Sequence, residues 1–85
     1  MNQTTRILTA ISSTEPSTFR EFLRGLGDEA PEKGAKHDWY ILFKTLESLE
    51  ETGLVEIERT GSAIDTLILT DLGAERAREA LRESR

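Results

Sequence analysis

The hydrophobic period of the chain changes from helical to extended at a single glycine, Gly53. After it, residues 54–59 alternate between apolar and charged, which is the spacing of a strand with one wet face. Because glycine accepts the left-handed backbone that ends many helices, Gly53 predicts a tight reversal from helix into strand. A helix over residues 37–52, capped by Asp38, is therefore expected to run directly into a strand. Its buried face has apolar residues spaced three or four apart: Trp39, Leu42, Phe43, Leu46 and Leu49.

Helical spacing of apolar residues also predicts shorter helices on both sides of this junction. Thr18 and Glu21 have the spacing of a capping box, which predicts the start of an amphipathic helix. Residues 27–36 contain two glycines and a proline, and predict a loop or one helical turn after Pro31. We therefore expect helices over residues 4–13, 18–26, 37–52 and 71–83, and a β-hairpin over residues 54–70. The last helix is expected to bury Leu72, Ala77, Ala80 and Leu81.

Three helices, a hairpin and a last helix follow the order of the winged helix-turn-helix fold, and two segments resemble MarR- and PadR-type transcriptional regulators. Residues 45–55 (TLESLEETGLV) resemble the junction between their recognition helix and first wing strand. Residues 69–73 (LTDLG) resemble the start of the helix after their wing. The resemblance implies one α+β winged helix-turn-helix domain over residues 1–85. Residues 27–36 form a longer linker than the roughly three to four residues of a compact helix-turn-helix.

Several chemistries lack the residues that they need. The chain has no cysteine, which excludes disulfides and cysteine-based zinc sites, and its one histidine has no partner at metal-ligating or triad spacing. No run of about 18 apolar residues predicts a membrane span, and the N-terminus lacks the pattern of a signal peptide. We therefore expect a protein that is not an enzyme, with no cofactor and no evident small-molecule ligand. The expected location is a prokaryotic cytoplasm, or the host cytoplasm if the source is viral.

The resemblance implies sequence-specific binding of double-stranded DNA, as in a repressor, with the recognition helix in the major groove and the hairpin on the backbone or minor groove. With its leucines turned inward, the helix presents an opposite stripe without carboxylates, while Glu47, Glu50 and Glu51 lie toward the end away from the groove. Lys44 suits a phosphate or guanine, and Ile41 a thymine methyl group. The expected DNA-binding residues are Lys36, His37, Tyr40, Ile41, Lys44, Ser48, Arg59, Thr60 and Ser62.

Other interpretations of these residues remain open. Tyr40 and Ile41 equally fit the edge of the core or a dimer interface, and Arg59 equally fits a cross-strand pair with Asp65. The net charge of −5 opposes DNA binding unless the acidic residues lie away from the docking face. The alternative function is a protein–protein interaction module in a transcription or replication assembly.

Dimerisation is a separate expectation. A chain of 85 residues buries only a thin core. The last helix also carries small residues, Ala74, Ala77 and Ala80, whose spacing allows two helices to approach closely. We therefore expect a homodimer through the C-terminal and N-terminal helices, with the alternative that the alanines pack on the first helix of the same protomer.

Overall fold

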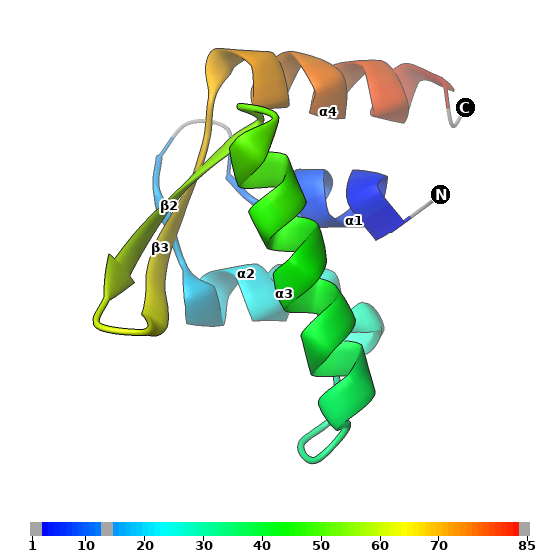
Figure 1. The fold of residues 1–85 in the computed structure, drawn as a ribbon. Helices are drawn as coiled ribbons and strands as arrows, with labels where there is room; N and C mark the ends of the chain where they lie inside the picture. The colour runs from blue at the N-terminus through cyan, green and yellow to red at the C-terminus, as the bar shows by residue number, and fades with distance from the viewer. Residues whose placement is uncertain (1–2, 13–14, 84–85) are drawn as a thin grey trace.

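The computed structural model describes residues 3–12 and 15–83. Over these ranges the chain is an α+β protein with four α-helices and a three-stranded antiparallel sheet (Figure 1). In chain order the elements are α1 (Gln3–Ala10), β1 (Ser17–Thr18), α2 (Phe19–Leu26), the 3₁₀ helix η1 (Gly27–Glu29), α3 (Lys36–Glu51), β2 (Val55–Thr60), β3 (Ala63–Leu69) and α4 (Asp71–Glu83).

The first two helices follow the predicted pattern closely. α1 ends at Ala10, before the predicted end at residue 13, which lies outside the described residues. At the start of α2, the Thr18 hydroxyl accepts a hydrogen bond from the Glu21 amide, and the Glu21 carboxylate accepts one from the Thr18 amide, both at 3.1 Å. The predicted capping box is therefore confirmed.

This capping box predicts a measurable acid sensitivity. The hydrogen bond from the Thr18 backbone lowers the pKa of Glu21 below its ordinary value. Its stabilisation is therefore present above the unfolded pKa of about 4.3 and is lost as pH falls through the lower folded pKa. We expect Glu21→Gln to lose less stability than the wild type between pH 5 and pH 3, measured by urea unfolding. Equal pH slopes would contradict this, and Glu75→Gln, which replaces an exposed α4 carboxylate, is the control.

The start of α3 differs from the prediction. The helix begins at Lys36 and its N-terminal cap is Ala35, which makes no side-chain capping bond. The prediction that Asp38 caps the helix is wrong, because the Trp39 amide already donates to the Ala35 carbonyl at 3.1 Å. Asp38 consequently lies inside the first turn, where its negative charge interacts favourably with the positive end of the helix dipole.

The sheet contains one strand that sequence patterning did not predict. β1 is only two residues long and pairs with β3, so the strand order is β1-β3-β2. β2 and β3 form the predicted hairpin, but their register shifts between Glu58, opposite Thr66, and Arg59, opposite Ile64. Asp65 is the extra residue of this β-bulge and has no residue directly across from it.

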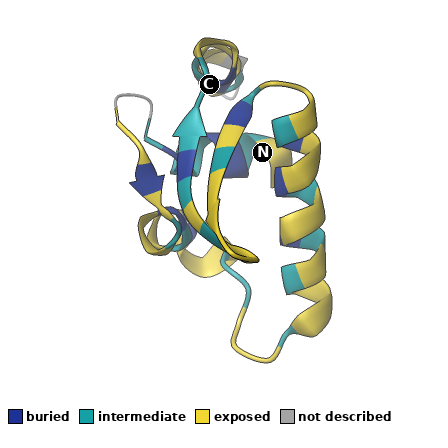
Figure 2. Ribbon diagram, turned by 60° about the vertical axis from the view of Figure 1, so that its left-hand side comes forward, coloured by how far each residue is buried: buried dark blue, intermediate teal, exposed yellow. Residues whose placement is uncertain are grey.

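The hydrophobic core lies between the helices and the inner side of the hairpin. Figure 2 shows buried residues on the inward sides of the elements and exposed residues along the outer side of α3. Phe22, Leu46 and Leu67 are completely buried. The other buried apolar residues are Ile7, Leu8, Ile11, Leu26, Leu42, Leu49, Val55 and Ala77.

Several residues predicted to lie in the core are at its edge. On α3, Trp39 is half-buried and Phe43 is 39% exposed, because both lie on a flank where they stack on each other and on Phe19. On α4, Leu72 and Leu81 are exposed. The helix is seated instead by its smallest residues, and Gly73 and Ala77 are buried.

Two turns at the base of the hairpin are joined to each other. Gly53, with φ +80°, ends α3, and the amides of Gly53 and Leu54 donate to the carbonyls of Glu50 and Leu49 in a Schellman pattern. The Thr70 hydroxyl donates to the Gly53 carbonyl at 2.6 Å and accepts from the Gly73 amide at 3.0 Å. The predicted reversal at Gly53 is confirmed, and its turn is bonded to the start of α4.

Candidate nucleic-acid interface

The outer face of α3 presents most of the residues predicted to bind DNA. Tyr40 is 59% exposed, and the Lys44 side chain is 58% exposed. Leu42, Leu46 and Leu49 are buried on the opposite side, which confirms the predicted orientation of the leucines, but Phe43 of the predicted inner face is partly exposed. The exposed residues of the stripe are Lys36, His37, Tyr40, Lys44 and Ser48.

Ile41 does not belong to this exposed stripe. It is half-buried on the flank of α3 that faces α1, where it lines a groove with Leu42. Its carbonyl also accepts a hydrogen bond from the Thr45 hydroxyl at 2.8 Å. Ile41 therefore lies at the groove rather than on the outer face of the helix.

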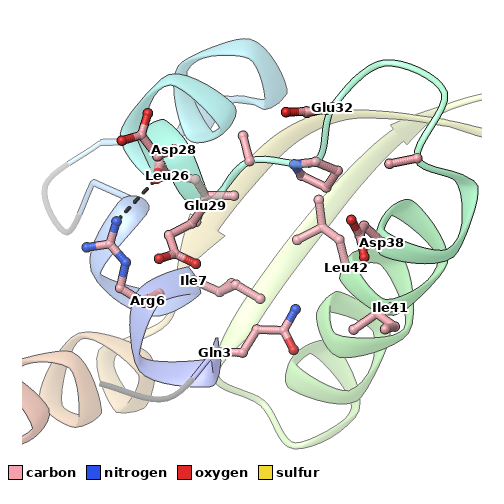
Figure 3. A pocket seen from close by; sticks show the side chains of 13 residues that line it. Gln3, Arg6, Ile7, Leu26, Asp28, Glu29, Glu32, Asp38, Ile41 and Leu42 are labelled. Atoms are coloured by element: carbon pink, nitrogen blue, oxygen red, sulfur yellow. Dashed lines mark hydrogen bonds between the residues drawn. The ribbon is translucent and has the colours of Figure 1, made fainter.

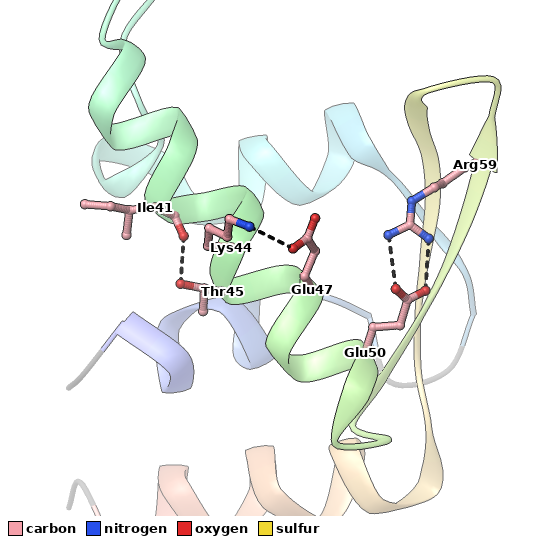
Figure 4. Close-up of polar contacts among 6 residues, drawn as sticks. All are labelled: Ile41, Lys44, Thr45, Glu47, Glu50 and Arg59. Atoms are coloured by element: carbon pink, nitrogen blue, oxygen red, sulfur yellow. Dashed lines mark hydrogen bonds and ion pairs between the residues drawn. The ribbon is translucent and has the colours of Figure 1, made fainter.

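Lys44 has a carboxylate beside it. Its ammonium lies 3.5 Å from the Glu47 carboxylate and 5.7 Å from the centre of the Tyr40 ring (Figure 4). The expectation that the glutamates lie away from the stripe is therefore wrong for Glu47, since residues three apart on a helix are neighbours. Both partners are more than half exposed, and such surface ion pairs are weak enough to exchange for another anion.

Arg59 is held more firmly than Lys44. Its two terminal nitrogens each donate to one oxygen of the Glu50 carboxylate at 3.0 Å (Figure 4). This bidentate pair lowers the pKa of Glu50 and raises the pKa of Arg59. The alternative of a cross-strand pair with Asp65 is wrong, because the bulge places Ile64 opposite Arg59.

The tip of the hairpin offers hydroxyl groups rather than cations. Thr60 and Ser62 are exposed on either side of Gly61, which has φ +63°. Glu56 and Glu58 are exposed farther down β2. The structure therefore brings Thr60 and Ser62 together, while the nearby strand adds negative charge.

The predicted loop over residues 27–36 builds one wall of a groove. This groove of about 500 Å³ lies between α1, the loop and α3 (Figure 3). Arg6 donates to the Leu26 carbonyl at 3.2 Å at one end, and the Trp39 ring nitrogen fastens the loop to α3 through the Glu32 carbonyl at 3.0 Å. The groove is apolar at its floor and is lined by four carboxylates, Asp28, Glu29, Glu32 and Asp38. An anionic partner is disfavoured on this flank of α3.

An aromatic cluster occupies the other flank of α3. The ring centres of Phe19 and Phe43 lie 6.0 Å apart, as do those of Trp39 and Phe43. Sequence reasoning assigned Phe43 to the core and missed this partly exposed surface. In the sequence, this surface is indicated by two aromatic residues, Trp39 and Phe43, which lie four positions apart at the margin of the apolar face.

Among residues 3–12 and 15–83, no three His, Asp or Glu side chains are placed to hold one metal ion. No helix within these ranges is both long and apolar enough to cross a membrane.

Comparisons with protein-family models, curated proteins and solved structures find no match for this chain.

Proposed function

We propose that the chain is a winged helix-turn-helix domain that binds double-stranded DNA, with α3 in the major groove and the β2–β3 hairpin as its wing. The observation that carries the proposal is the exposed stripe of α3. Over its first three turns it presents Lys36, His37, Tyr40 and Lys44 to solvent. These side chains supply cations and hydrogen-bond donors for phosphates and base edges.

The element order supports this proposal. α2 and α3 precede a hairpin that turns back beside α3, and α4 follows it (Figure 1). The leading end of α3 also carries the positive end of its helix dipole, which favours an anionic ligand and which the exposed Asp38 in the first turn partly offsets. Lys33 and Lys36 are exposed around this end, within the long linker and the first turn. Glu50 and Glu51 lie in the last turn, at the opposite end of the helix.

The proposal includes a homodimer, since one protomer offers few cations. Docking through α1 and α4 would cover Leu72 and Leu81, which are 45% and 47% exposed. Ala77 is buried within the protomer, where α4 contacts α1, whereas Ala74 and Ala80 are half-buried. Light scattering that gives 9.6 kDa at every concentration would remove the dimer from the proposal.

The direct test is charge reversal on the stripe. We expect Lys44→Glu to weaken binding of a random duplex at least about tenfold at low salt, because it replaces a phosphate-binding cation with a carboxylate. Fluorescence anisotropy with a labelled duplex, at 50 and 150 mM salt, measures the change.

The matched control is Arg76→Glu, which makes the same charge change on the exposed side of α4. Circular dichroism and light scattering check that both variants keep the fold and the oligomeric state. Absence of wild-type binding at 50 mM salt would overturn the proposal, as would an equal loss in both variants.

The second candidate is a protein-interaction module, and the two ion pairs favour it. Lys44 and Arg59 are both engaged by glutamates of α3, and the chain carries a net charge of −5. Exposed Tyr40 and partly exposed Phe43 would then contact a protein partner. A wild-type protein that binds no duplex at low salt would leave this candidate in place.

A further inference from the structure

The wing arginine points toward the protein rather than away from it. Along β2, Val55 is buried, Ile57 is half-buried, and Glu56 and Glu58 are exposed. Because side chains alternate across a strand, Arg59 continues the side of Val55 and Ile57, which faces α3. The bulge at Asp65 lies directly opposite this point and bends the hairpin there.

Glu50 is the residue of α3 that the Arg59 side chain contacts. The Schellman turn at Gly53 reverses the chain so that β2 runs back beside the last turns of α3. Glu50 therefore meets a residue nine positions later in the chain, and its two oxygens accept both terminal nitrogens of Arg59 at 3.0 Å. The guanidinium offers two parallel N–H donors that match a carboxylate and a phosphate equally well, and Glu50 occupies this pair on the two terminal nitrogens.

We infer that Glu50 limits the affinity of the domain for DNA by holding Arg59 away from the phosphate backbone. This inference rests on the proposed function. To bind a phosphate with both terminal nitrogens, Arg59 must leave Glu50, and the carboxylate then stays unpaired beside the duplex. In the wild type, the hairpin therefore binds DNA through its hydroxyl groups. Arg59 adds to DNA binding only when Glu50 is neutralised or displaced.

The test compares four proteins with the wild type on one labelled duplex. Glu50→Gln releases Arg59 and removes one negative charge, whereas Glu51→Gln removes the neighbouring charge without touching Arg59. Arg59→Ala and the double variant Glu50→Gln/Arg59→Ala separate release of the arginine from loss of charge. Urea unfolding confirms that each variant is folded.

We expect Glu50→Gln to bind about three- to tenfold more tightly than the wild type, and Glu51→Gln to change the affinity less than about twofold. The slope of log affinity against log salt should steepen by about 0.9 for each released arginine. Arg59→Ala alone should weaken binding only slightly, because it leaves the Glu50 carboxylate unpaired, and it should abolish the gain in the Glu50→Gln background.

Different outcomes separate this inference from the proposed function. If the wild type binds and Glu50→Gln gains no more than Glu51→Gln, only the inference is overturned. The inference is also overturned if Arg59→Ala weakens DNA binding in the wild-type background as strongly as in the Glu50→Gln background. Arg59 would then already contact DNA in the wild type. If neither the wild type nor Glu50→Gln binds duplex at 50 mM salt, the proposed function itself is overturned and the inference with it.

Discussion

Replacing Gly73 with alanine is expected to lower the free energy of unfolding by about 3 kcal/mol, an effect at the upper end of overpacking. A Cβ at this position would collide with the carbonyl oxygen of Leu54. That carbonyl cannot move aside easily, because it accepts a hydrogen bond from the Thr70 amide at 3.2 Å. The clash outweighs the gain of about 1 kcal/mol that alanine brings over glycine within a helix. Urea unfolding followed by circular dichroism measures the change.

Gly25 provides a graded control for this prediction. It also lies within a helix, and a Cβ there would approach the Ala10 carbonyl oxygen at 2.9 Å. This tight contact is milder than the collision at Gly73, so Gly25→Ala should cost clearly less. A Gly73→Ala protein as stable as the wild type would mean that α4 is not seated on the Leu54 turn.

Truncation of Phe22 should have a comparable effect. The side chain is 0% exposed, and Phe→Ala changes in protein cores typically cost about 3–5 kcal/mol through lost burial and the cavity that remains. Domains have only about 5–15 kcal/mol of stability in total, so Phe22→Ala is expected to leave a marginally folded protein. Thermal unfolding and urea unfolding both report the loss.

Phe43→Ala is the matched control because it deletes the same side chain from the edge of the core. Phe43 is 39% exposed and contacts Phe19 and Trp39 by stacking. We expect a loss of about 1 kcal/mol, in line with an aromatic pair at a partly exposed site. If Phe43→Ala proved as destabilising as Phe22→Ala, the structure would understate the burial of Phe43.

Most secondary structure was predictable because its signals are local. The capping box depends on Thr18 and Glu21, three positions apart, and the change of period at Gly53 is read from the residues on either side of it without any distant contact. β1 was not predictable in this way, because a two-residue strand carries no alternation and exists through pairing with β3. The 3₁₀ helix likewise lies in a segment that has no apolar period.

Less of the candidate site was predictable, because ion pairing depends on tertiary structure. Arg59 pairs with Glu50 because of a bulge in the opposite strand and the direction in which β2 leaves α3. Neither feature can be predicted from the spacing of neighbouring residues. Glu47 differs, since its position three residues after Lys44 was sufficient to predict the ion pair. The exposure of Phe43 is likewise a tertiary property, because only Phe19 of α2 and Trp39 stack on its ring.

The hydrogen bonds of Thr70 fix the base of the hairpin in place. Its hydroxyl joins the turn after α3 to the start of α4, and its amide bonds to Leu54 at the base of β2. These segments are expected to tilt only as one rigid body, so that bending of the hairpin is confined to the part beyond the bulge at Asp65.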